Sequence, residues 1–147
     1  MNNKYSSLLN KIKSVVDPTL PLVSNLSNIS ALLYTLENIN WAGFYLSNGE
    51  YLYLGPFQGE VACSKIDFNR GVCGHAYSTR KTVIVDDVNA FKGHIACSSK
   101  SRSEIVTPII KDEKVLGVID IDSPILARFS KDEKNLLEEV ALLICKL

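Results

Sequence analysis

The sequence has no excess of charge of either sign. Sixteen lysines and arginines balance sixteen aspartates and glutamates over 147 residues, so the formal net charge at pH 7 is zero. Without a positive field over the whole molecule, the chain has little that would attract nucleic acid or an anionic lipid surface. We therefore expect neither a nucleic-acid partner nor a membrane partner.

Long apolar runs and export signals are also missing. The segment from Met1 to Leu9 has one lysine and no apolar stretch before a small-residue cleavage site. Every later apolar run is interrupted by Asp, Lys or Asn before it reaches the roughly 18 to 20 residues that cross a bilayer. These absences predict a cytoplasmic protein.

Glycine and proline are scarce, with 8 and 5 residues, which argues against a fibrous or disordered chain. Hydrophobic residues make up 46% of the sequence and charged residues 22%, as in ordinary globular proteins. The length fits a single domain with a sizeable core. We expect one domain over residues 1–147.

Hydrophobic spacing predicts helices at both ends of the chain and hairpins between them. The expected elements are a helix with Leu8, Leu9, Ile12, Val15 and Val16 on its apolar face and its end at Asp17 and Pro18, a helix with Leu22, Leu26, Ile29, Leu32, Leu33 and Leu36, strands over 41–46, 51–54, 65–68 and 82–85, a helix near 74–79, a hairpin of 105–110 with 115–121, and a helix from about Ser130 with a Ser130/Glu133 capping box. This order indicates an α+β domain in which helices cover one face of an antiparallel sheet.

The four cysteines show no CxxC spacing, which excludes a thioredoxin-type motif and a paired zinc knuckle. Cys63, Cys73 and Cys97 each lie in a loop-like segment near glycine, whereas Cys145 falls in the last predicted helix. Functional side chains concentrate on loops, and buried structural cysteines lie inside apolar elements. The first three are therefore candidates for redox chemistry, with a packing role as the alternative.

A Cys2His2 zinc site is a second alternative, and its ligands would be Cys73, His75, His94 and Cys97. Zinc accepts these donors, but structural sites usually leave two to four residues between neighbouring ligands, and Cys73 and His75 are separated by one. We expect no metal.

Three acids form another candidate cluster. Along 115–122 the side chains of a strand alternate, so Leu116, Val118, Asp120 and Asp122 share one face. Glu104 begins the partner strand. With a two-residue turn at Asp112 and Glu113 the carboxyl of Glu104 points away from the aspartates, whereas an odd-length loop or a β-bulge puts all three acids on one face. A three-acid pocket therefore requires such an irregularity.

Six segments, in order, carry a family resemblance. They are 41–46 (WAGFYL), 55–59 (GPFQG), 61–63 (VAC), 71–74 (GVCG), 93–97 (GHIAC) and 103–106 (SEIV). Together they resemble the free methionine-(R)-sulfoxide reductases, small enzymes built on a GAF domain, and the similarity runs from about residue 25 to 122. It implies a GAF-like fold.

The resemblance implies a role for each candidate residue. Cys97 matches the catalytic thiol, Cys63 the thiol that forms a disulfide with it, and Cys73 an auxiliary cysteine. The remaining matches are Glu104, Asp120 and Asp122 as substrate-binding acids and Trp41 and Tyr45 as the wall around the thioether methyl group. It implies free L-methionine (R)-sulfoxide as substrate, no bound cofactor, and thioredoxin, ultimately NADPH, as reductant. By analogy the terminal helices are a candidate homodimer surface.

The chemistry of the residue types agrees with this function. A thiol attacks the sulfur of a sulfoxide when a nearby acid protonates the oxygen, and the resulting sulfenic acid condenses with a second thiol. The alternative from another class is a stand-alone GAF domain that binds a small molecule as a sensor. Both predicted terminal helices belong to the domain itself, so such a sensor would have to act through a partner.

Overall fold

The computed structural model describes residues 1–93 and 100–147. Its elements are α1 (Asn3–Val15), α2 (Leu22–Leu33), β1 (Trp41–Ser47), β2 (Leu52–Gly59), β3 (Lys65–Ile66), α3 (Gly71–Thr79), β4 (Val83–Val85), a 3-10 turn (Val88–Ala90), β5 (Ser103–Lys111), β6 (Lys114–Ser123) and α4 (Lys131–Ile144). Every predicted element is present, with shifted ends. None of the described helices is long and apolar enough to cross a bilayer.

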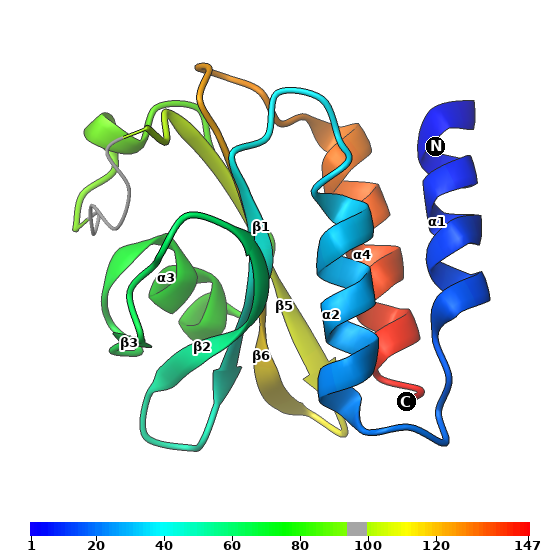
Figure 1. Cartoon of the computed structure of the whole chain (residues 1–147). Helices are drawn as coiled ribbons and strands as arrows, with labels where there is room; N and C mark the ends of the chain where they lie inside the picture. The colour runs from blue at the N-terminus through cyan, green and yellow to red at the C-terminus, as the bar shows by residue number, and fades with distance from the viewer. Residues whose placement is uncertain (94–99) are drawn as a thin grey trace.

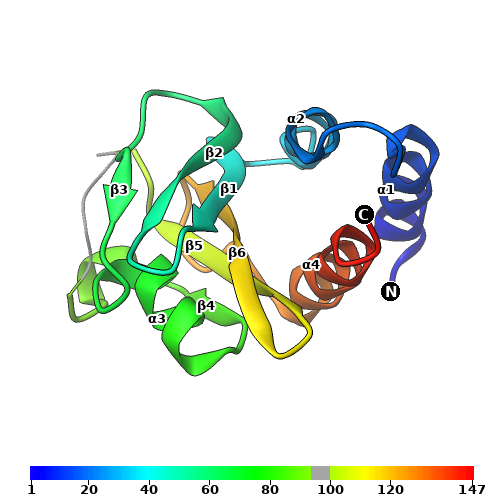
Figure 2. The same ribbon diagram turned by 90° about the horizontal axis from the view of Figure 1, so that it is seen from below.

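The strands form one six-stranded antiparallel sheet in the order β3-β2-β1-β6-β5-β4. Helices α1, α2 and α4 lie on one side of it, and α3 lies on the other (Figure 1). The view from below shows the same two sides (Figure 2). The expected α+β architecture, with the terminal helices on one face of the sheet, is confirmed. Helix α3, whose side was not predicted, packs on the opposite face.

The terminal helices and one face of the sheet form the first hydrophobic core. Strand residues such as Phe44, Ile119 and Ile121 contribute to it, each at most 1% exposed. Leu36 belongs to this core although α2 already ends at Leu33. Val15, by contrast, is 41% exposed and takes no part in the predicted stripe.

The predicted capping box is present at the start of α4. Ser130 accepts a hydrogen bond from the backbone of Asp132, and Glu133 accepts one from the backbone N–H of Ser130. The Glu133 carboxylate also accepts the hydroxyl of Tyr5 and pairs with Arg128 at 3.2 Å. Because Tyr5 lies on α1, this buried network joins the first helix to the last.

The second hydrophobic core lies on the α3 face of the sheet and includes Trp41, Tyr45 and Cys73. Helix α3 starts at Gly71, earlier than expected, so Cys73 lies in the first turn of a helix rather than in a loop. A Cβ atom on Gly74 would lie 2.8 Å from the carbonyl oxygen of Phe68. Glycine at this position therefore lets the helix start close against the preceding chain.

The hairpin of β5 and β6 contains the irregularity on which the three-acid pocket depends. Asp112 and Glu113 make a two-residue turn, both with positive φ, between paired Lys111 and Lys114. The register then shifts between Ile109 and Ile110. This bulge leaves Leu116 without a partner and changes the register of every later pair.

Beyond the bulge the faces of β6 differ in one respect from the prediction. Leu116 packs against the helix-side core, together with Ile119 and Ile121, and not with Val118, which belongs to the second core. The alternation expected for the whole strand is interrupted at the bulge, so it holds only from Gly117 onward.

Candidate active site

The bulge brings the three predicted acids together on the α3 face. Glu104 lies opposite Asp122 across β5 and β6, and Val106 lies opposite Asp120. On the other side of β6, Trp41 of β1 pairs with Asp122. Glu104 and Asp120 are only 8% and 5% exposed. The hairpin irregularity that a three-acid pocket requires is therefore present, and the acids form a buried carboxyl cluster.

This burial changes the protonation of the cluster. The pKa of Glu104 is raised well above its ordinary value by desolvation first and then by the negative charges of Asp120 and Asp122. The pKa of Asp122 is raised in the same way, by burial and by the charge of Asp120. No ion pair joins Glu104 or Asp122 to a lysine or arginine among residues 1–93 and 100–147. The cluster therefore holds protons at a pH where exposed carboxyls have lost theirs, and it would accept a cation.

Cys73 faces this cluster from α3. Its Sγ lies 3.4 Å from Oδ2 of Asp120, with the thiol as donor, and the residue is 3% exposed. Burial and the nearby carboxylates of Asp120 and Glu104 raise the pKa of the Cys73 thiol well above its ordinary value. One ligand atom each from Cys73, Glu104 and Asp120 lie within 4.8 Å of one another. A protonated Cys73 is a weak nucleophile and a hydrogen-bond donor.

Aromatic rings line the cluster on the β1 side. Trp41 and Tyr45 stack with ring centroids 5.9 Å apart, and Phe57 of β2 stacks on Trp41 at 5.2 Å. The space for the Phe57 ring comes from Gly43, where a Cβ atom would lie 2.3 Å from Cβ of Phe57. These rings form an apolar wall beside the carboxyl groups.

The wall is joined to the loop of Cys63. The hydroxyl of Tyr45 donates to the carbonyl of Cys63 at 2.8 Å, and Nε1 of Trp41 donates to the carbonyl of Glu60 at 3.1 Å. Burial is the main cause of the raised pKa of Tyr45, so its hydroxyl stays protonated as a donor. Both aromatic side chains therefore position the loop that carries Cys63.

The cysteines differ in their bonding. Cys63 is half-buried and disulfide-bonded, whereas Cys73 and Cys145 are free thiols. Cys97, the predicted catalytic thiol, lies outside the described residues. Cys145 directly follows α4, where its thiol donates to the carbonyl of Ile110 at 3.0 Å, in keeping with the packing role expected for it.

The two proposed zinc ligands that the structure describes, Cys73 and His75, do not form part of a common site. Cys73 is buried against the acids, while His75 is exposed and meets the ring of Phe91 edge-on. Residues two apart on a helix point in nearly opposite directions, so α3 separates these two side chains. The other two proposed ligands, His94 and Cys97, lie outside the described residues.

Three residues beside the cluster were missed. Phe57 belongs to the 55–59 segment, and an aromatic residue in a strand paired with a Trp-containing strand could have indicated a third ring in the wall. A hydrogen bond from Ser101 lowers the pKa of Asp122, although burial outweighs it. Ser101 in turn accepts the side-chain amide of Asn40 at 3.2 Å. Nothing in the spacing of Asn40 and Ser101 points to this contact.

Comparisons with known proteins match nearly the whole chain. The GAF domain family model matches residues 21–146. The free methionine-R-sulfoxide reductase of Escherichia coli is 44% identical over 141 residues, which cover 95% of this chain and 86% of that protein. The Saccharomyces cerevisiae free methionine-R-sulfoxide reductase is 47% identical, with coverage of 97% and 89%.

A solved structure extends the likeness to three dimensions. The free methionine-R-sulfoxide reductase from Neisseria meningitidis, determined in complex with its substrate, superposes with a TM-score of 0.94 at 44% identity and covers 99% of this chain and 90% of that one. This chain belongs to the free methionine-R-sulfoxide reductase family, oxidoreductases built on the GAF domain.

Proposed function

We propose that the protein reduces free L-methionine (R)-S-oxide to L-methionine, with Cys97 as nucleophile and Cys63 as resolving thiol. The observation that carries the proposal is the buried carboxyl cluster beside an aromatic wall that is hydrogen-bonded to the loop of a disulfide-bonded cysteine. The relatives named above support the same substrate.

Recognition of a free amino acid requires a counter-charge for its α-ammonium group. Glu104, Asp120 and Asp122 are suited to this role because they supply carboxyl groups at one buried place. An entering ammonium group favours the ionised form of the acid that it contacts. Trp41 and Tyr45 offer apolar area to the thioether end of the substrate.

The reaction needs one proton donor and one nucleophile. The sulfur of Cys97 attacks the sulfoxide sulfur while a carboxylic acid of the cluster protonates the oxygen. Oxygen passes to Cys97 as sulfenic acid, and methionine leaves with its sulfur reduced by two electrons. The raised pKa values of Glu104 and Asp122 keep these acids protonated to a higher pH than exposed carboxyl groups, which supports proton delivery from this cluster.

Cys63 completes the cycle in this proposal. Its thiol condenses with the sulfenic acid of Cys97, which forms a disulfide and releases water. The disulfide bond at Cys63, with Cys73 and Cys145 free, supports this pairing. The dithiol of thioredoxin then reduces the disulfide by thiol exchange, with electrons that come ultimately from NADPH.

The deciding measurement is methionine release from each pure epimer of free methionine sulfoxide with dithiothreitol, for the intact protein and for Cys97→Ser. We expect release from the R epimer alone and none from the variant. Activity retained by Cys97→Ser would assign the nucleophile to another thiol. Absence of release from either epimer, with folded and reduced protein, would favour the ligand-sensor function instead.

A further inference from the structure

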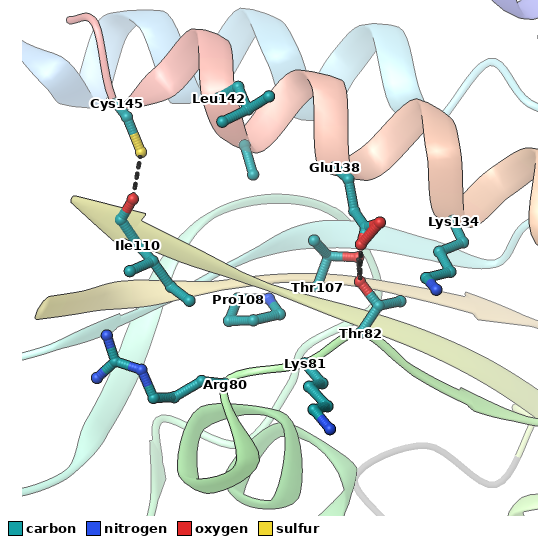
Figure 3. A pocket seen from close by; sticks show the side chains of 11 residues that line it. Arg80, Lys81, Thr82, Thr107, Pro108, Ile110, Lys134, Glu138, Leu142 and Cys145 are labelled. Carbon is teal, nitrogen blue, oxygen red and sulfur yellow. Dashed lines mark hydrogen bonds between the residues drawn. The ribbon is translucent and has the colours of Figure 1, made fainter. Parts of the chain in front are cut away.

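A second pocket, of about 410 Å³, lies at the β4–β5 edge of the sheet, between α4 on one face and the end of α3 on the other (Figure 3). Figure 3 shows it from close by, with Arg80 and Lys81 on the side of α3 and Lys134 on the side of α4. Its volume falls within the range of small-molecule sites. Neither the proposed reaction nor the carboxyl cluster uses any of its residues.

Pro108 explains why a pocket forms at this place. The ladder between β4 and β5 ends at the pair Val83 and Val106. A proline has no N–H to extend a ladder, so the strands separate before Pro108 is reached. Thr82 and Thr107 instead contact each other through their hydroxyls at 3.0 Å.

The pocket concentrates positive charge in a chain whose formal net charge is zero. Arg80, Lys81 and Lys134 contribute three positive charges against one negative charge from Glu138. The ion pairs found among residues 1–93 and 100–147 involve none of these four side chains. The Glu138 carboxylate instead accepts the Thr82 hydroxyl at 3.1 Å, which holds it against the sheet.

The remaining lining is mainly apolar, from Pro108, Ile110, Ala141, Leu142 and Cys145. Leu142 is 58% exposed, so part of this surface meets solvent in the single chain. The Arg80 guanidinium donates to the backbone carbonyl of Glu113, whereas Lys81 and Lys134 form no ion pair among residues 1–93 and 100–147. An apolar lining beside these two lysines complements a molecule with an apolar body and one negative head group.

We propose that this pocket is a second ligand site, which takes a small organic anion with an apolar body, such as a carboxylate or a phosphate monoester. The head group lies between Lys81 and Lys134, and the body lies against Pro108 and Leu142 (Figure 3). The proposal does not depend on the reductase function, because none of these residues belongs to the carboxyl cluster or to the aromatic wall.

The test uses 8-anilinonaphthalene-1-sulfonate, an anionic fluorescent probe, with the full chain. We expect saturable fluorescence enhancement that persists in excess methionine sulfoxide. Lys81→Glu combined with Lys134→Glu should weaken binding roughly tenfold or more, because four units of charge change beside the sulfonate. Glu138→Gln should strengthen it, since the Gln side chain keeps an acceptor for Thr82 and removes the negative charge.

The matched control is Lys131→Glu, an exposed lysine on the same helix and outside the pocket lining, which should leave probe affinity within roughly twofold. N-phenyl-1-naphthylamine, which lacks the sulfonate, should bind at least about tenfold more weakly than the anionic probe. Displacement by octanoate or by octyl phosphate identifies the preferred head group. Amide shifts on probe binding should centre on Thr82, Ile110 and Leu142.

Three results would overturn the proposal. Probe affinity that is unchanged in the lysine double variant would show that these cations do not bind the head group. Displacement by methionine sulfoxide would place the probe in the carboxyl cluster. A change from monomer to dimer or the reverse in the pocket variants would indicate that a second copy of the chain, not a small anion, covers this surface.

Discussion

Glu104 and Asp122 face each other across the β5–β6 ladder, and burial raises the pKa of both carboxyl groups. Two acids at directly opposite positions repel each other when both are ionised. The pair therefore costs stability at neutral pH. An entering cation would remove that repulsion.

The first prediction concerns stability. Because the pKa of Glu104 is higher in the folded state, folded protein binds more protons than unfolded protein above the ordinary pKa of 4.5, and stability falls as the pH rises through this window. Glu104→Gln removes the ionising group. We expect the free energy of unfolding to increase by about 1–2 kcal/mol at neutral pH, with the gain disappearing toward pH 4.5. Urea denaturation at both pH values measures it.

The exposed Glu139→Gln on α4 is the control for this experiment, and its stability should stay near that of the unchanged protein at both pH values. A Glu104→Gln variant that is less stable at neutral pH would mean that Glu104 stabilises the folded chain.

The second prediction concerns substrate affinity. Asp122→Asn removes one carboxylate from the proposed ammonium site, so KM should rise roughly tenfold or more while kcat changes less. In the unchanged protein KM should fall as the pH rises from acid toward neutral, because the ammonium group binds the ionised acids. Initial rates over a pH series measure both effects. The exposed Asp86→Asn should match the unchanged protein, and a loss of kcat alone in Asp122→Asn would assign it to proton delivery.

The third prediction separates the chemical step from recycling. Cys63→Ser should release about one methionine per chain without added reductant and then fail to turn over with thioredoxin, because no thiol resolves the sulfenic acid. Rapid quench of pre-reduced protein measures the burst. Cys145→Ser removes a free thiol that donates to Ile110 and should turn over normally. Fast repeated turnover by Cys63→Ser would contradict its resolving role.

The fourth prediction concerns Cys73. The Cys73 thiol donates to Asp120, so a hydroxyl group can replace it and a methyl group cannot. Cys73→Ser should keep most of the kcat/KM, whereas Cys73→Ala should lower it by roughly tenfold. Steady-state rates of the two variants measure the difference. If Cys73→Ser is as inactive as Cys97→Ser, Cys73 takes part in the thiol chemistry itself.

The fifth prediction concerns the loop of Cys63. Tyr45→Phe keeps the ring in the aromatic wall but loses the hydrogen bond to the Cys63 carbonyl. Losing this hydrogen bond should cost about 1 kcal/mol, which corresponds to a roughly fivefold slower disulfide step. The methionine burst should be unchanged. Tyr53→Phe, at an exposed ring on β2, is the control. An equal loss in the burst would show that the Tyr45 hydroxyl serves the first step instead.

Much of the fold could be predicted because its signals are local. The Ser130 capping box, the hairpins and the apolar face of the last helix each depend on neighbouring residues, and each is present in the structure. The exact start of α3 was not predicted, since it depends on close packing of Gly74 against the carbonyl of Phe68. That contact joins segments whose approach no periodicity describes.

The grouping of the three acids could be predicted only on the condition that the β5–β6 hairpin contains an irregularity. The alternation of β6 places Asp120 and Asp122 on one face, but the face of Glu104 depends on a single unpaired residue in the hairpin. That unpaired residue is Leu116, and its side chain packs against the helix-side core. No rule of composition selects the position of a bulge, so only the structure could remove the ambiguity.

The alternation of β6 has a consequence for any comprehensive substitution scan of this chain. Ile119 and Ile121 belong to the helix-side core, whereas Asp120 and Asp122 lie in the carboxyl cluster. Abundance of folded protein should therefore drop at the two isoleucines and hold at the two aspartates, while catalysis per folded molecule should show the reverse. Adjacent codons would report on different selective pressures, and the two profiles along the strand would oscillate out of phase.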